Sequence, residues 1–336
     1  MIIPTHRSVL VAFATLLLIH AARAADREVV VAADGSGDYR TVQAAVDAAP
    51  DAAPDASDSD GRTVVRIRPG TYEEKLDVPR GKGPLVFLGG GKSPDETVLT
   101  YSDNASTLGP DGENVGTTGS TSVMISADDF TAENLTFANS AGDTGQAVAV
   151  KTNGDRVAFF DCRFLGWQDT LYPNGARTYF KDCHIEGSTD FIFGRATAVF
   201  ESCTILSKKG SYITDASTEA ESPFGFVFLN CKLVSATGEP TYLGRPWRDH
   251  AAVAFIDSEL GGHIRAEGWH NWNKPDAEAT VRYVEHGNTG PGANLAGRVS
   301  WATELPAEQA ARYTPLRLLA GDDGWHPERC GDAGDS

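Results

Sequence analysis

The chain has 336 residues and a formal net charge of −17, and its length fits one large domain or two. The acidic balance disfavours nucleic acids and anionic membrane surfaces as partners, because phosphate binding needs clustered lysine and arginine. It does not exclude a sugar polymer, especially one whose carboxylates are esterified and therefore neutral.

The first 24 residues have the pattern of a secretory signal peptide. His6 and Arg7 precede an apolar run from Val9 to Ile19, and Ala22-Arg23-Ala24 offers the small-x-small pattern of a signal-peptidase site. The run is too short to span a bilayer, which needs about 20 apolar residues. We therefore predict cleavage after residue 24, a secreted protein in an extracellular or periplasmic location, and one domain over residues 25–336.

Two segments near the start of the mature chain lie outside any repeat. Tyr39 to Ala49 predicts a short helix that begins after Thr41 and is stopped by Pro50, and we expect it to cap the open end of the fold. Its apolar face consists of Val42, Ala45, Val46 and Ala49. The stretch 50–61 is rich in Ala, Asp and Pro and predicts a mobile acidic surface loop.

The middle of the chain repeats a short motif. Each unit alternates apolar residues and is bounded by Gly, Asn, Asp or Ser, which is typical of a strand followed by a turn. A small residue occupies the same place in each unit, with steps of 28, 21, 20, 28 and 27 residues between successive positions. These positions are Asn134, Cys162, Cys183, Cys203, Cys231 and Ser258.

A strand that recurs every 20 to 28 residues predicts an all-β solenoid, a right-handed single-stranded parallel β-helix in which each repeat is one coil. The Leu-x-x-Leu-x-Leu frame of leucine-rich repeats is absent, and propeller blades need about 40 residues or more. The spaces between units lack amphipathic helical patterns, which disfavours βαβ units. From about Trp301 to Ser336 the periodicity is fragmentary, and we expect an irregular tail that packs along the side.

The cysteines indicate core packing rather than chemistry. None of the five, which include Cys330, forms a CxxC pair, and no histidine lies at metal-ligand spacing, so a zinc site is disfavoured. If the cysteines stack on adjacent strands, Cys183 and Cys203 are close enough to form a disulfide in an exported chain. The same argument applies to Cys162 with Cys183, and free stacked thiols are the alternative.

Two aspartates share one register of the repeat. Asp169 lies seven residues after Cys162, and Asp190 lies seven residues after Cys183, so stacked cysteines would place the aspartates on adjacent coils about 4.8 Å apart. Two carboxyl groups held so close resist ionising together, which leaves one anion and one proton donor at the same pH. That is the minimum for acid–base or nucleophilic chemistry, although two surface turn residues would show the same spacing.

The segments around the aspartates add further candidates. Gln146 and Gln168 carry amides that can donate to a developing oxyanion. Arg245 can hold a carboxylate ionised and oriented, and Trp247 can stack on the apolar face of a sugar ring. Separately, each has a structural explanation: glutamines on turns, an arginine in a salt bridge and a tryptophan in the core.

Taken together and in this order, the motifs resemble the pectin methylesterase (pectinesterase) family along nearly the whole mature chain. The opening Val-Val-Ala-Ala-Asp34-Gly-Ser-Gly-Asp38 is similar to the start of that family. The later motifs are Gln146-Ala-Val-Ala-Val, Gln168-Asp169-Thr-Leu-Tyr172, Asp190-Phe-Ile-Phe-Gly194, Leu-Gly-Arg245-Pro-Trp247, Gly268-Trp269-His-Asn-Trp272 and the segment from Tyr283 to Ala293. Each alone is moderately specific, whereas the complete ordered set is very specific.

The resemblance implies a role for each matching residue in methyl-ester hydrolysis on a galacturonate polymer. Asp190 would be the nucleophile, kept ionised by Arg245, and Asp169 the protonated general acid that later acts as base. Gln146 and Gln168 would stabilise the oxyanion. The implied substrate-binding residues are Thr117, Gln146, Arg245 and Trp247. The family pattern implies methylated pectin as partner and no metal or organic cofactor. We expect the protein to be a monomer.

Two local departures from the family pattern concern the site. The segment around Thr117, from Gly116 to Ser122, differs from the usual wording, so this assignment rests on position alone. Ser188-Thr189 replaces the more usual Thr-Val before the nucleophile, a small change that could alter the packing of Asp190.

Three other functions compete with this interpretation. A serine esterase would need a Gly-x-Ser-x-Gly elbow, which the chain lacks. A β-helical glycosidase or lyase would also use carboxylates, but the Arg-Pro-Trp and Gln-Asp-Thr-Leu-Tyr segments do not resemble those families. An esterase of another substrate, such as an acyl thioester, or a non-catalytic sugar-binding β-helix, is the third alternative.

Overall fold

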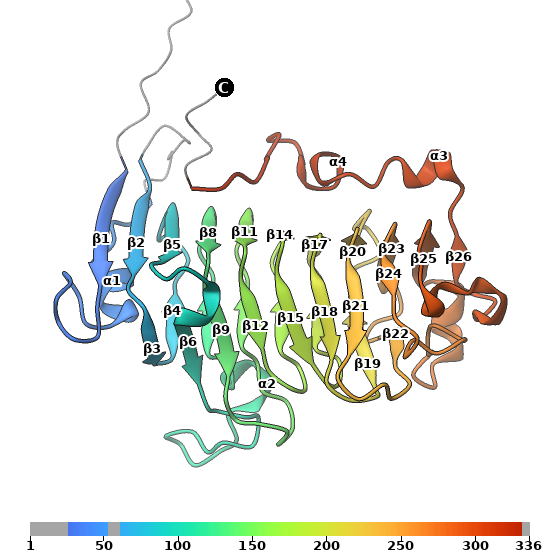
Figure 1. The fold of residues 1–336 in the computed structure, drawn as a ribbon, viewed down its shortest axis with the longest axis horizontal. Helices are drawn as coiled ribbons and strands as arrows, with labels where there is room; N and C mark the ends of the chain where they lie inside the picture. Colours follow the sequence, from blue (N-terminus) through green and yellow to red (C-terminus); the bar gives the residue numbers. More distant parts are fainter. Residues whose placement is uncertain (1–25, 53–60, 331–336) are drawn as a thin grey trace, which may run out of the picture.

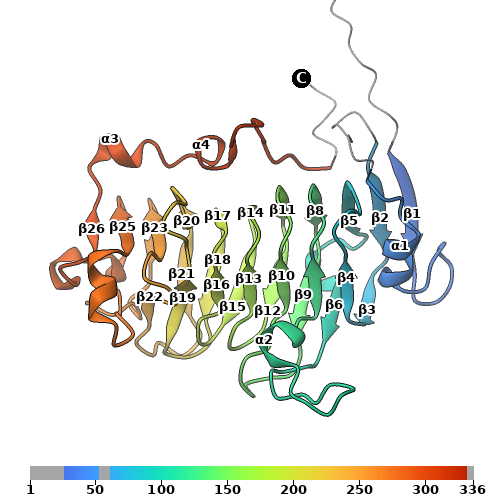
Figure 2. The same ribbon diagram turned by 180° about the vertical axis from the view of Figure 1, so that it is seen from behind.

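The computed structural model describes residues 26–52 and 61–330, which wind into a right-handed parallel β-helix (Figures 1 and 2). The predicted signal peptide and residues 53–60 of the predicted acidic loop lie outside the described residues. Along the described chain, every pairing between named strands is parallel. The predicted fold class is therefore confirmed.

Successive coils contribute strands to three parallel sheets. The first sheet contains β1 (Arg27–Val31), β2 (Thr63–Ile67), β5 (Leu85–Gly89), β8 (Phe130–Glu133), β11 (Val157–Phe160), β14 (Arg177–Lys181), β17 (Thr197–Glu201), β20 (Phe226–Leu229), β23 (Ala252–Ile256), β25 (Arg282–His286) and β26 (Thr303–Glu304). The second sheet contains β4 (Leu76–Val78), β7 (Val123–Ile125), β10 (Val150–Thr152), β13 (Leu171–Pro173), β16 (Ile192–Gly194), β19 (Tyr212–Ala216) and β22 (Tyr242–Pro246). The third sheet contains β3 (Gly70–Glu73), β6 (Thr97–Tyr101), β9 (Thr136–Asn139), β12 (Arg163–Leu165), β15 (His184–Gly187), β18 (Thr204–Ser207), β21 (Lys232–Ser235) and β24 (Glu259–Leu260).

Helices are short and lie at the margins. Those described are α1 (Val42–Ala48), α2 (Gly116–Gly119), α3 (Ala307–Ala310) and α4 (Pro315–Leu319), with the 3₁₀ turns η1 (Pro94–Glu96), η2 (Pro275–Ala279), η3 (Pro291–Ala293) and η4 (Leu295–Gly297). The hydroxyl of Thr41 caps α1 by accepting from the amide of Ala44. The predicted apolar face of α1 is buried, and the helix lies at the N-terminal end of the solenoid (Figure 1).

Stacks of like side chains, one from each coil, fill the interior. In the first sheet, the stacked rings of one phenylalanine column have centroids 4.4–5.1 Å apart between neighbouring coils, because parallel strands repeat at about 4.8 Å. The column consists of Phe159, Phe180, Phe200, Phe228 and Phe255. The regular spacing of the motif in the sequence is thus the spacing of one coil.

The four core cysteines also stack, as predicted, and all are free thiols. Each thiol donates to the carbonyl two residues earlier, at 3.3 Å for Cys162 and 3.4 Å for Cys203. The hydroxyl of Ser258 makes the same contact at 3.1 Å. This position therefore suits a small side chain with a hydrogen to donate, and the structure contains no disulfide between Cys183 and Cys203.

The predicted alignment of the first unit is wrong by one residue. Arg163 on β12 pairs with Thr136 on β9, so Leu135, not Asn134, shares the level of Cys162. Asn134 instead has a φ of 56° and occupies the left-handed turn position that Asp161 fills one coil later, with a φ of 50°. Short polar side chains tolerate this conformation, which explains why Asn, Asp or Ser precedes the stacked residue.

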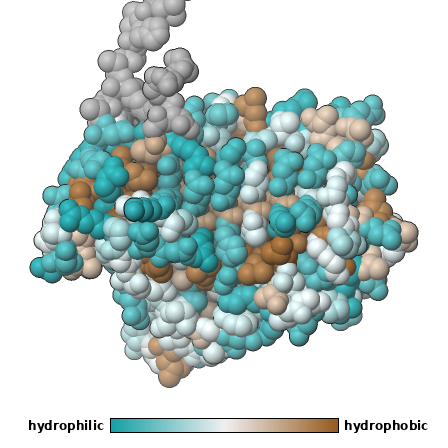
Figure 3. All heavy atoms as spheres, viewed as in Figure 1, coloured by the Kyte–Doolittle hydropathy of each residue, from teal (hydrophilic) through white to brown (hydrophobic). Residues whose placement is uncertain are grey.

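The C-terminal segment, including α3 and α4, runs back over the first sheet toward the N-terminal end (Figures 1 and 2). Leu305, Leu318 and Leu319 join a second apolar cluster on the outer face of that sheet. The face in Figure 3 is mainly hydrophilic, with scattered hydrophobic patches. The predicted tail along the side of the solenoid is thus present, and it contains short helices.

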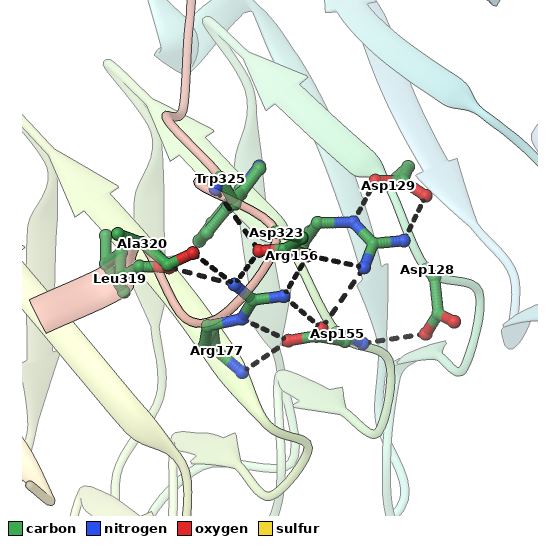
Figure 4. Close-up of polar contacts among 9 residues, drawn as sticks. All are labelled: Asp128, Asp129, Asp155, Arg156, Arg177, Leu319, Ala320, Asp323 and Trp325. Carbon is green, nitrogen blue, oxygen red and sulfur yellow. Dashed lines mark hydrogen bonds and ion pairs between the residues drawn. The ribbon is translucent and has the colours of Figure 1, made fainter. Parts of the chain in front are cut away.

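An ion-pair network anchors this C-terminal strap, residues 305–330 (Figure 4). Arg177 on β14 binds Asp323 through Nη1 at 2.5 Å and Nη2 at 2.7 Å. It also bonds Asp155 and the carbonyls of Leu319 and Ala320. Two adjacent coils are thereby tied to one point of the strap.

Candidate active site

The outward face of the second sheet presents one row of side chains in register. Lys151 pairs with Tyr172, Phe193 pairs with Asp215, and Asp215 pairs with Arg245. The rings of Tyr172 and Phe193 stack with centroids 4.1 Å apart. The parallel ladder thus places two aromatic rings, a carboxyl group and a guanidinium side by side on successive coils.

Asp169 and Asp190 lie at the turns that lead into this sheet, just before β13 and β16. Both have left-handed backbones, with φ values of 64° and 50°. The amide of Asp169 donates to the carbonyl of Thr189 on the next coil at 3.0 Å, and the amide of Asp190 donates to Tyr212 at 2.9 Å. The predicted shared register of the two aspartates is present, and both side chains are buried.

Arg245 forms a bidentate ion pair with Asp190. Its Nε lies 3.0 Å from Oδ1 and its Nη2 lies 2.5 Å from Oδ2. Two aromatic rings hold the guanidinium in place, with the centroids of Tyr212 at 4.1 Å and Trp272 at 3.7 Å. Such stacking orients a planar guanidinium. The two rings and the Asp190 carboxylate together fix the position of the Arg245 guanidinium.

Burial and charge separate the protonation states of the two aspartates. Burial raises the pKa of Asp169 to about 8, with a further rise from the Asp190 carboxylate, and Arg245 and Gln168 oppose the rise. Burial also raises the pKa of Asp190, while the hydrogen bonds and charge of Arg245 oppose this directly. Asp190 therefore ionises first, and Asp169 carries a proton at neutral pH.

The remaining predicted residues surround the two aspartates in one groove of about 570 Å³. Gln146 and Gln168 form a parallel bridge on adjacent coils. Thr117 on α2 and Trp247 after β22 lie along the same groove. The groove is lined by all seven predicted site residues together with Val115, Gly116, Thr118, Tyr172, Phe193, Asp215 and Trp272.

Several lining residues were not assigned a role from the sequence. Tyr172 and Phe193, with Trp247 at ring distances of 6.1 and 6.0 Å, form an aromatic platform, and Asp215 is a third buried carboxyl group. A signal was present, because Tyr172, Phe193 and Asp215 follow one another at intervals of 21 and 22 residues. Extending the coil spacing to these positions would have found them.

Gly194 allows the coils to pack this closely beside the platform. Its φ is 131°, and a Cβ there would lie 2.3 Å from the carbonyl oxygen of Pro173. Any other residue would therefore force β16 away from β13. The glycine that ends the Asp190-Phe-Ile-Phe-Gly194 motif thus has a steric reason.

The described part of the chain, residues 26–52 and 61–330, contains no cluster of three or more His, Cys, Asp or Glu side chains that could hold a metal ion. In the same residues, no helix is long and apolar enough to cross a membrane.

An ionised carboxylate next to a protonated one, with amide donors beside them, suits nucleophilic and acid–base chemistry at a carbonyl group.

Comparisons with known proteins agree with the motifs. The model of the pectinesterase family matches residues 28–322. Pectinesterase 31 of Arabidopsis thaliana is 41% identical over 298 residues, which cover 86% of this chain and 91% of that protein. Among solved structures, a pectin methylesterase from carrot has a TM-score of 0.80 at 36% identity and covers 88% of this chain and 93% of its own. A pectin methylesterase in complex with a hexasaccharide has a TM-score of 0.76 at 29% identity and covers 91% and 100%.

Proposed function

The chain belongs to the pectinesterase family, and we propose that it hydrolyses the methyl esters of pectin to methanol and free galacturonate carboxylates. The observation that carries the proposal is the buried Asp190–Arg245 ion pair next to a protonated Asp169 in one groove. The pair supplies an oriented anion, and its neighbour supplies a proton.

Asp190 is the proposed nucleophile. Its carboxylate attacks the ester carbonyl carbon, and the electron pair of the carbonyl moves onto oxygen, where the amides of Gln146 and Gln168 donate hydrogen bonds. The tetrahedral intermediate collapses as the bond to the methoxy oxygen breaks. Asp169 gives its proton to that oxygen, so methanol leaves and an acid anhydride joins Asp190 to the galacturonate.

Water completes the reaction. The carboxylate of Asp169 takes a proton from a water molecule, whose oxygen attacks the galacturonate carbonyl of the anhydride. The bond to the Asp190 oxygen breaks and Asp190 regains its charge. The free sugar carboxylic acid loses its proton to solvent, and both aspartates return to their starting states. Arg245 decides which aspartate is the nucleophile and which is the acid, because its guanidinium forms hydrogen bonds with the carboxylate of Asp190.

The groove suits a sugar chain. Trp247, Tyr172 and Phe193 offer apolar surfaces on which pyranose rings can stack, and Thr117 faces the same space from α2. The hexasaccharide complex of a solved relative supports a site for several sugar units. We therefore propose that methylated homogalacturonan lies along the groove over the aspartates.

Methanol release from highly methylated pectin tests the proposal. Asp190→Asn should reduce the rate about 10³-fold or more, because the amide is a poor nucleophile. Asp182→Asn is a matched control: Asp182 shares the left-handed backbone, with a φ of 54°, but its carboxylate pairs with Arg329. If the wild-type protein released no methanol but cleaved an acyl thioester, the substrate would be that thioester and not pectin. An active Asp190→Asn variant would exclude the nucleophile.

The cellular context is part of the proposal. The signal-peptide pattern of residues 1–24 supports export, with a mature chain that begins at Ala25. The proposed active form is a monomer, since all seven assigned site residues line one groove of one chain. Mass spectrometry of the exported protein and its sedimentation at assay concentration test these two points.

A further inference from the structure

Asp215 is a buried carboxyl group for which the proposed reaction has no use. It lies on β19, in register with Phe193 on one side and Arg245 on the other, and it lines the groove. Its side chain is largely buried, with the residue 5% exposed, and its Oδ1 has no hydrogen-bond partner among the described residues. Leaving a buried polar atom unpaired is unfavourable, so packing alone does not account for a carboxyl group at this position.

The charged groups around Asp215 come from several elements. Asp190 and Asp169 lie at the turns before β16 and β13, Arg245 lies on β22, and Lys274 precedes η2. The phenol of Tyr283 on β25 is also within electrostatic range. Burial is the largest influence and, together with the two aspartates, raises the pKa of Asp215 to about 9, against the opposing effect of Arg245 and Lys274. Asp215 is therefore neutral where Asp190 is charged.

Asp190 and Asp215 are both neighbours of the Arg245 guanidinium. Arg245 uses Nε and Nη2 to hold Asp190, and its register partner on β19 is Asp215. A neutral Asp215 leaves that contact undisturbed. An ionised Asp215 would be a second carboxylate competing for the same cation one strand away, and it would add a repulsive charge next to Asp190.

We propose that Asp215 is a positioning residue whose proton keeps Arg245 on Asp190, so that loss of this proton disables the nucleophile. The proposal rests on the proposed function, since the nucleophile is the group that is disabled. It assigns a second protonated carboxyl group to the working site: Asp169 gives its proton to the leaving group, whereas Asp215 keeps its own throughout.

The pH dependence of kcat/KM for methanol release distinguishes this role from simple packing. In the wild type, loss of the Asp169 proton should lower activity above about pH 8, and loss of the Asp215 proton should lower it further above about pH 9. The alkaline limb of the profile therefore becomes steeper. Asp215→Asn is isosteric and permanently neutral, and only the first loss should remain. One unit above the second pKa, the ratio of variant to wild-type activity should be about tenfold higher than at neutral pH. An alkaline limb of the same steepness in both proteins overturns the proposal.

A second measurement does not depend on activity. A carboxyl group with a raised folded pKa holds a proton that the unfolded chain, with a pKa of about 3.9, has lost. Stability therefore falls as pH rises between those two values. Asp215→Asn removes this loss, so its melting temperature relative to wild type should rise by several degrees from about pH 5 to about pH 8. A constant difference overturns the proposal.

Asp215→Ala provides the same comparison if the amide packs poorly, since alanine is also neutral. Failure of the proposed function would be visible separately: the wild type would release no methanol, while the melting-temperature comparison would still report whether Asp215 carries a proton in the folded protein.

Discussion

Arg245 contacts both carboxylate oxygens of Asp190, although the two residues are 55 positions apart in the chain. The contact exists because β22 lies two strands from β16 in the second sheet, with β19 between them. The aromatic rings of Tyr212 and Trp272 hold the guanidinium from either side. In a groove whose other ionisable lining groups are Asp169, Asp215 and Tyr172, this pair decides which carboxyl group is the anion.

Arg245→Ala should therefore raise the pKa of Asp190, because burial then acts without an opposing charge. We expect kcat for methanol release to fall by about 10²-fold or more. The acidic limb of the pH profile should move to higher pH, since the protonated nucleophile persists further. Steady-state kinetics across the pH range measure both effects.

Arg66→Ala is the matched control for this substitution. Arg66 makes the same two-bond contact with Glu28, at 2.9 and 3.0 Å, but on the surface and away from the groove. Its loss should change stability by about 0–1 kcal/mol and leave the pH profile in place. If Arg245→Ala lowered activity with no movement of the acidic limb, Arg245 would bind substrate without tuning Asp190.

The coil spacing made much of this site predictable from the sequence. A parallel β-helix places residues at equal sequence intervals on adjacent coils. Asp169 and Asp190 each follow a stacked cysteine by seven residues, and this equal interval was enough to predict that they lie side by side. The spacing also predicted a common level for the cysteines, and the structure confirms it. Local periodicity translates directly into tertiary contact in this fold.

Other features depend on information that periodicity does not carry. Tyr212 and Trp272 hold Arg245 through side-chain directions, which spacing alone does not specify. The predicted register at Asn134 is wrong because the stacked position of that unit holds Leu135 in place of a small residue, while the small polar residue stands at the turn one position earlier. The left-handed backbone that separates the two positions is a property of the coil and not of the residue spacing. The coil spacing would place Asp215 in the row of the site, but its burial arises from neighbouring coils and does not follow from the spacing.

The free thiols give a prediction about chemical reactivity. In the native protein, Ellman's reagent should modify at most Cys330, because the four stacked cysteines are buried. After unfolding it should modify five thiols. Burial also raises the pKa of Cys162 and Cys203, which keeps their reactive thiolate forms scarce. A count of three after unfolding without reductant would show that one disulfide forms, with Cys183 and Cys203 the first candidates to map.

The C-terminal strap should depend on Arg177. Arg177→Ala removes bonds to Asp155, Asp323 and two strap carbonyls, so we expect a loss of about 1–3 kcal/mol in the free energy of unfolding and faster proteolysis of residues 305–330. Methanol release should be retained, since Arg177 lies outside the candidate groove. Arg195→Ala, which breaks an exposed pair with Glu219, is the control. Equal protease sensitivity of the two variants would argue against anchoring by Arg177.

Asp169 should show opposite effects of one substitution on activity and stability. Asp169→Asn cannot protonate the departing methanol, so turnover should fall by about 10²–10⁴-fold. The folded protein, however, gains from the change at neutral pH. In the unfolded chain an aspartate ionises near pH 3.9, whereas the folded pKa is about 8, so between these values folding requires uptake of a proton and stability falls as pH rises.

An asparagine avoids this uptake, so the variant should gain about 1–4 kcal/mol relative to wild type at pH 7, with the gain vanishing near pH 4. Denaturant unfolding at the two pH values, followed by tryptophan fluorescence, measures it. Asp182→Asn serves as reference, because Asp182 has the same left-handed backbone as Asp169 but its carboxylate pairs with Arg329 outside the groove. If the gain of Asp169→Asn were the same at both pH values, the resting Asp169 would be ionised, and the proton for methanol would have to come from another group.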